Sequence, residues 1–148
     1  MQITGLPRVL IIESQLIVAA DIALQLTRWR YEVIGIGTQP EEALEYLTRH
    51  RPDIVILGGK VGSRAGGERL SALITQQMRI PLVMLSGSSD QRCWESIVAA
   101  RPYAFIPKPF RREDLQRAMK LTVERMVAEG ISLQLADEPQ LVRRVSRA

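Results

Sequence analysis

The residues of this sequence that could do chemistry directly follow apolar runs. Four such runs end in Glu13-Ser14, Gly58-Gly59-Lys60, Ser86-Gly87 and Lys108-Pro109. In an open parallel α/β sheet, ligands and reactions gather beyond the carboxyl ends of the strands, so these groups are expected to meet at one edge. The sequence offers no serine–histidine–aspartate set, paired carboxylates or metal cluster at useful spacing, so we predict that the protein is not an enzyme and holds no metal.

One of these groups opens a glycine-rich stretch, GGKVGSRAGG, from Gly58 to Gly67. Backbone N–H groups ahead of a helix can cradle a phosphate or a small nucleotide. The stretch is not a Walker motif, because Lys60 is followed by Val61 and the required spacing fails. A loop without a ligand is the simpler interpretation.

The elements that must position these groups follow a regular alternation. Segments rich in β-branched residues alternate with segments of helical period, which predicts an α/β fold with helices on both faces of a parallel sheet. Strands are predicted over residues 8–13, 32–36, 54–57, 82–85 and 103–106, and each is followed by a predicted helix.

Two helices show a clear apolar face. In the first, the residues expected to face the core are Leu16, Ile17, Ala20 and Leu24, with Ala23 as a further candidate. In the last, over residues 112–128, they are Leu115, Ala118, Met119, Thr122 and Met126.

Length and composition limit the protein class. The chain has 148 residues and a net charge of +4, enough for one domain. No apolar run approaches the roughly 18 residues of a membrane span, and MQITGLPR is not a signal peptide, so we expect a cytoplasmic protein without membrane contact. One cysteine and one histidine are too few ligands for a structural zinc site.

The predicted domain covers residues 6–128, and residues 129–148 form a C-terminal tail expected to be extended or flexible. Residues 101–148 carry 10 basic and 6 acidic side chains, so the positive charge lies in this last third. Nucleic acid is still not expected as a partner. No aromatic residue is interleaved with Arg143, Arg144 and Arg147, and there is no helix-turn-helix.

Several of these features together resemble the receiver domain of two-component response regulators, over roughly residues 6–127. They are the five strand–helix units, the acidic residue after the first strand, PDIVIL at 52–57, the serine ending the fourth strand and KPF at 108–110. The resemblance implies a flavodoxin-like, doubly wound five-stranded parallel sheet in the order 2-1-3-4-5 with five helices. It also implies phosphoryl transfer from a histidine kinase to an aspartate after the third strand.

The resemblance implies roles for individual residues. Lys108 matches the lysine that pairs with the phosphoryl oxygens, Ser86 the hydroxyl that follows the phosphate, and Phe105 the switch aromatic. Glu13 matches the first member of the acidic pair that holds Mg²⁺.

Two positions depart from the family pattern. The second acidic position, which ligates the metal directly, is Ser14, and the phosphoacceptor position is Gly58. An acyl phosphate needs a carboxylate nucleophile, and Mg²⁺ is usually held by one or two carboxylates. We therefore predict an atypical receiver, or pseudo-receiver, with weak or absent Mg²⁺ binding and no cofactor.

For such a domain, the sequence favours a single-domain signalling module that acts by phosphorylation-independent protein–protein interaction. The partner would be a histidine kinase, another receiver or an output protein, with a homodimer through helix 4, strand 5 and helix 5 as one form. The candidate interface residues on that face are Trp94, Tyr103, Arg111, Arg112, Arg117 and Lys120.

Two alternatives remain open. Lys108, with Glu13 as its only evident partner, could join Ser86 and the Gly58–Gly67 loop in binding a small anion or a nucleotide. A receiver that still transfers phosphoryl groups through a non-standard acceptor is the second alternative.

Overall fold

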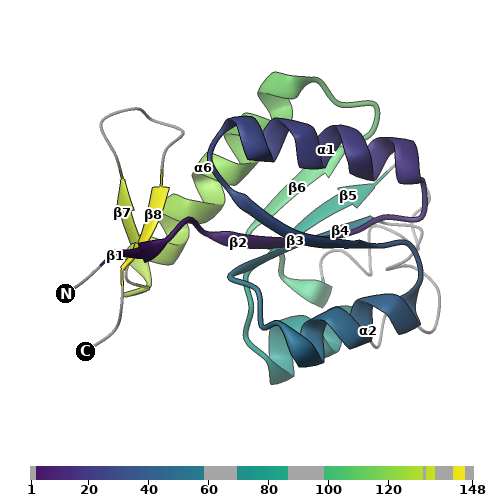
Figure 1. The fold of residues 1–148 in the computed structure, drawn as a ribbon, viewed down its shortest axis with the longest axis horizontal. Coiled ribbons are helices and arrows are strands. Elements are labelled where there is room, and N and C mark those ends of the chain that lie inside the picture. The colour runs from purple at the N-terminus through teal and green to yellow at the C-terminus, as the bar shows by residue number, and fades with distance from the viewer. Residues whose placement is uncertain (1–2, 59–69, 87–98, 132, 136–141, 146–148) are drawn as a thin grey trace.

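A five-stranded parallel sheet forms the centre of the molecule (Figure 1). The computed structural model describes residues 3–58, 70–86, 99–131, 133–135 and 142–145. The strands lie in the order β3-β2-β4-β5-β6. Their bounds are β2 (Arg8–Ile12), β3 (Glu32–Gly37), β4 (Ile54–Gly58), β5 (Leu82–Ser86) and β6 (Ala104–Pro107). Numbered among themselves, these strands have the order 2-1-3-4-5, which confirms the predicted fold.

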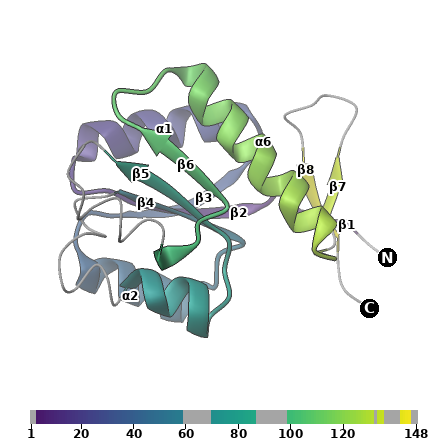
Figure 2. The same cartoon turned by 180° about the vertical axis from the view of Figure 1, so that it is seen from behind.

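Helices cover both faces of this sheet, as Figure 2 shows from behind. On one face lie α1 (Leu16–Arg28) and α6 (Arg112–Ala128), and on the other lie α2 (Pro40–Arg49) and the π-helical η1 (Leu73–Gln77). The described residues thus contain four helices where five were predicted. The remaining helix was predicted over residues 90–101, most of which lie outside the described residues.

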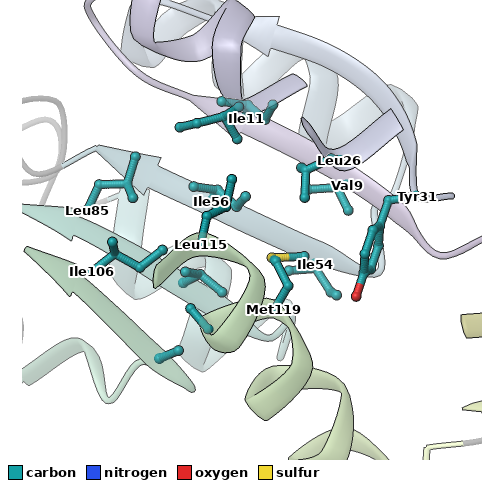
Figure 3. Packing of buried hydrophobic residues seen from close by; sticks show 14 of the residues in the cluster. Val9, Ile11, Leu26, Tyr31, Ile54, Ile56, Leu85, Ile106, Leu115 and Met119 are labelled. Carbon is teal, nitrogen blue, oxygen red and sulfur yellow. The ribbon is translucent and has the colours of Figure 1, made fainter. Parts of the chain in front are cut away.

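Alternation along the strands divides the core into two layers, because successive side chains of a strand point to opposite faces. Val9, Ile11, Ile54 and Ile56 pack under α1 and α6 (Figure 3). Their neighbours in sequence, such as Leu10 and Ile12, face α2 and η1 instead. Every residue of β4 is buried, as expected for a central strand that is covered on both sides.

Helix α1 corrects the sequence prediction. Its buried residues are Ala19, Ile22 and Leu26, whereas Ile17 is 87% exposed. Leu16, Ala20 and Leu24 are exposed as well, whereas the further candidate Ala23 is half-buried and packs against the core. The segment is apolar on nearly all sides, so its period does not define a single face, and the sheet selects the face that carries Ile22. In α6 all five predicted core residues are buried, and Val123 joins them.

A second, smaller sheet was not predicted. It is antiparallel and has the order β1-β8-β7, with β1 (Ile3–Gly5), β7 (Leu133–Leu135) and β8 (Val142–Val145). It joins the two ends of the chain beside the carboxyl end of α6, on the side where the main strands begin (Figure 1). Ile131, just before β7, packs against the core under α1 and α6. The pairing of β1 with β8 spans nearly the whole sequence, and local pattern carries no signal for it.

Two substitutions in α1 test which face is buried. We expect Ile22→Ala to lower the free energy of unfolding by about 2–5 kcal/mol, because it leaves a cavity in the core. Ile17→Ala removes a comparable side chain from the exposed face and should change that free energy by less than about 0.5 kcal/mol. Urea denaturation followed by circular dichroism measures both, and equal effects would contradict the observed face.

Candidate functional site

The polar groups at the carboxyl ends of the main strands do meet at one edge of the sheet. Gly58 and Ser86 are the last residues of β4 and β5, Lys108 follows β6, and Glu13 follows β2. Parallel register places Gly58 beside Leu85 and Ser86 beside Pro107. The edge expected from the sequence is therefore formed by these residues.

The central contact of the site is an ion pair between Glu13 and Lys108. The Lys108 ammonium donates a hydrogen bond to Glu13 Oε1, across 95 positions of sequence. The Glu13 side chain is 1% exposed and that of Lys108 is 21% exposed. A buried carboxylate is costly without a partner, so this pair is strongly held once the fold has formed.

The second oxygen of Glu13 is also occupied. Glu13 Oε2 accepts a hydrogen bond from the Gln15 backbone N–H at 2.7 Å, and the Ser14 hydroxyl lies 3.4 Å from the same oxygen. The Glu13 backbone N–H donates to the Gly37 carbonyl at 2.9 Å. The side chain is thus fixed at both oxygens and at its backbone, and it points into the site.

Gly58 makes room for this carboxylate. A Cβ atom built on Gly58 would lie 2.6 Å from Glu13 Oε1 and 3.0 Å from Glu13 Cδ. No real Cβ contact is as short as the first of these, so a larger residue would force the Glu13 carboxylate away from its present position. The position of the Glu13 carboxylate therefore depends on the absence of a side chain at position 58.

Two further sequence-predicted residues border the ion pair. Ser86 is buried, and its carbonyl accepts a hydrogen bond from the Lys108 backbone N–H at 2.6 Å. Phe105 is half-buried in β6 and packs against the core layer under α2 and η1. Gly59–Gly67, the rest of the glycine-rich loop, lies outside the described residues.

The candidate interface residues spread along α6 rather than around this site. Arg111 sits at the start of the helix, where its backbone N–H donates to Asp114 Oδ2 at 2.8 Å. Arg112, Arg117 and Lys120 are exposed on the helix. Trp94 lies outside the described residues.

Tyr103 lies at the far end of α6, away from the ion pair. Its hydroxyl donates a hydrogen bond to Glu129, and the Arg125 guanidinium stacks 4.2 Å from the ring centroid. Burial, followed by the contact with Glu129, raises the pKa of Tyr103 to about 12. The hydroxyl thus already has an intramolecular partner.

Comparison with known proteins identifies the family. Residues 9–120 match the response regulator receiver domain. The chain belongs to the response regulator receiver family. It is a receiver domain of a two-component-type regulator, and receiver domains generally serve as signalling modules that contact kinases and output proteins.

Individual relatives agree with this assignment. The transcriptional regulatory protein PdtaR of Mycobacterium tuberculosis is 31% identical over 145 residues, which cover 95% of this chain and 70% of that protein. The signal receiver domain of a modulated diguanylate cyclase from Desulfovibrio desulfuricans G20 superposes with a TM-score of 0.75 at 25% identity, covering 84% of this chain and 99% of that one. A CheY-like receiver domain from Methanospirillum hungatei JF-1 gives 0.75 at 21% identity, covering 85% and 100%.

Two other kinds of feature were not found among the described residues. They contain no cluster of three or more histidine, cysteine or acidic side chains that could hold a metal ion. They also contain no helix that is both long and apolar enough to cross a membrane.

Sequence reasoning identified the members of the site but missed the steric relation between Glu13 and Gly58. The sequence did contain a signal for this relation. Glutamate is one methylene longer than aspartate, so it needs more space, and the residue that ends β4 is a glycine. Only the β2–β4 pairing, which sets Ile12 beside Leu57, shows that the two residues face each other.

A double-mutant cycle tests this relation. Gly58→Ala should displace the Glu13 carboxylate and lower the free energy of unfolding by about 1–3 kcal/mol. In a Glu13→Asp background, where the carboxylate is drawn back, the same alanine should cost at least about 0.5 kcal/mol less. Chemical denaturation of the four proteins gives the coupling, and additive effects would show that the two residues do not compete for space.

Proposed function

We propose that this receiver is an atypical one that signals by protein–protein interaction without being phosphorylated and without catalysing a reaction. The observation that carries this proposal is the Glu13–Lys108 ion pair, whose carboxylate lies in the space that a side chain at position 58 would need. By the family resemblance, Gly58 is the acceptor position and Lys108 the residue that would pair with the phosphoryl group. In this chain Lys108 is already paired.

The same contact argues against ordinary Mg²⁺ binding. Mg²⁺ needs oxygen ligands in near-octahedral geometry, usually including one or two carboxylates. Among the described residues Glu13 is the carboxylate of this site, and its two oxygens have partners in Lys108 and Gln15. We infer that Mg²⁺ binds weakly or not at all, since it would have to displace the Lys108 ammonium.

It also argues against the small-anion alternative. An anion site built on Lys108 would need a free ammonium, and here Glu13 neutralises it. The nucleotide alternative additionally depends on the Gly58–Gly67 loop, of which only Gly58 is described.

The partner is proposed to dock on α6 and β6. At the N-cap and along the first half of α6, four basic residues are exposed: Arg111, Arg112, Arg117 and Lys120. The acidic side chains there are the exposed Glu113 and the half-buried Asp114. The nearest pair, Arg117–Asp114, is 4.0 Å apart at the surface and contributes little. This excess of basic charge favours an acidic surface on a kinase, another receiver or an output protein over a second copy of the same face.

Phosphoryl transfer can be tested with a small donor. Incubated with acetyl phosphate and Mg²⁺ and then weighed intact by mass spectrometry, the protein should gain no phosphoryl group, because position 58 offers no nucleophile. An adduct would overturn the proposal, and mapping it to Glu13 would establish a non-standard acceptor.

The matched control is Glu13→Asp/Ser14→Asp/Gly58→Asp. This variant restores the family's acidic residues and, with the shorter residue at position 13, the space for the new acceptor. We expect it to gain one phosphoryl group. The pair Gly58→Asp/Ser14→Asp, which keeps Glu13, should gain less, because the longer carboxylate still occupies the acceptor's space.

A further inference from the structure

The edge of the sheet opposite the candidate site carries an arginine at the beginning of every main strand. In sheet order they are Arg30 before β3, Arg8 in β2, Arg51 before β4, Arg79 before β5 and Arg101 before β6. Adjacent strands lie about 4.8 Å apart, so five strands place this row of arginines across roughly 19 Å. We call these residues the arginine row.

Three members of the arginine row adopt a backbone conformation that favours glycine. Arg30, Arg79 and Arg101 have φ angles of 66°, 55° and 50°. Helices commonly end in such a left-handed residue, and glycine or asparagine is favoured there because a Cβ atom costs free energy. These three are the described non-glycine residues with positive φ, and all three are arginine. An arginine in a strained backbone conformation at three equivalent turns suggests that its side chain has a function there.

The other two members hold the loops of this edge together. Arg8 NH1 donates to the Arg51 carbonyl at 3.2 Å, and the Arg51 guanidinium donates to the Met78 carbonyl. These contacts tie the beginning of β2 to the loop before β4, and that loop to the one before β5. In the middle of the row, the backbone is therefore held together by the row's own side chains.

The acidic side chains that the structure describes at this edge are already engaged. Glu32 lies 3.9 Å from Arg8, and Asp53 accepts a hydrogen bond from the Arg8 backbone N–H at 2.8 Å. Glu129 contacts Tyr103 and Arg125. Arg30, Arg79 and Arg101 are exposed, and within the described part of the chain none of them forms an ion pair.

The composition of this edge indicates the kind of partner. Stable protein interfaces have an apolar core, yet none of the described large apolar residues that are exposed lies in these strand-preceding loops. A polyanion with regularly spaced charges needs no such core, and the planar arginine fork matches phosphate oxygens. A nucleic-acid duplex presents one phosphate per strand for about every 3.4 Å of its axis, so several would face the row.

We propose that the arginine row binds the phosphodiester backbone of a nucleic acid without reading its bases. The sequence argued against a nucleic-acid partner because aromatic residues for base stacking were missing, but contacts to phosphates alone do not need them. The row also lies on the side of the molecule where the small sheet joins, and β8 of that sheet carries Arg143 and Arg144 in its sequence (Figure 1). This surface is separate from the Glu13–Lys108 site and does not depend on the function proposed for it.

The test uses the full chain and two fluorescently labelled probes of random sequence, a DNA duplex and a single-stranded RNA, each about 20 nucleotides long. Fluorescence anisotropy at increasing salt should show binding that weakens steeply with ionic strength. In the variant Arg30→Asn/Arg79→Asn/Arg101→Asn, asparagine tolerates the left-handed backbone, so the fold should be retained. Its affinity should fall at least about tenfold, and the slope of log K against log salt should become shallower by about 2–3 units.

The matched control is Arg112→Gln/Arg117→Gln/Lys120→Gln, which removes the same charge from α6. It should lose much less affinity than the arginine-row variant. The proposal is overturned if the wild type binds neither probe at low salt, if the two variants lose affinity equally, or if the arginine-row variant binds as the wild type does. Displacement of the probe by polyglutamate or by anionic vesicles at equal charge concentration would identify an acidic protein or a membrane as the partner and would also overturn it.

Discussion

The Glu13–Lys108 ion pair is the contact on which the candidate site depends. It joins the residue after β2 to the residue after β6, so it bridges the four neighbouring strands β2, β4, β5 and β6. Because Glu13 is almost completely buried, losing Lys108 would leave a carboxylate without compensation in the core. Gly58 is part of the same arrangement, since any side chain there would compete with the carboxylate for space. Substituting any one of the three residues therefore changes the contacts of the other two.

The two edges of the main sheet present different chemistry. At the carboxyl ends of the strands, one carboxylate and one ammonium neutralise each other in a largely buried site. At the amino ends, three exposed arginines have no ion-pair partner among the described residues, and their backbones are strained. A parallel sheet produces this separation directly, because all its strand beginnings lie on one side and all its strand ends on the other. A signalling protein built in this way can use its two edges independently.

The fold was largely predictable from the sequence, since five strand-like apolar segments that alternate with helical segments are a strong signal. The central strands β4 and β5 are buried at every residue. Helix α6 was predictable too, because the residues that recur at three- and four-residue intervals are the buried ones, although Leu121 and Val127 are exposed. Helix α1 was not, because it is apolar on nearly every side, and the wrong face was chosen from the period alone. The pairing in the β1-β8-β7 sheet was not predicted, because its strands are short and it joins opposite ends of the chain.

The sequence by itself determined which residues reach the site, because each directly follows a strand and the ends of parallel strands share one edge. It also determined that position 58 carries no nucleophile. Only the tertiary structure decided that Glu13 fills the space beside Gly58 and pairs with Lys108, since this depends on the register of β2 against β4 and on side-chain direction. It likewise decided that the arginines before the five strands form one row. These arginines are far apart in the sequence, and they become neighbours only through the order of the strands, which packing determines.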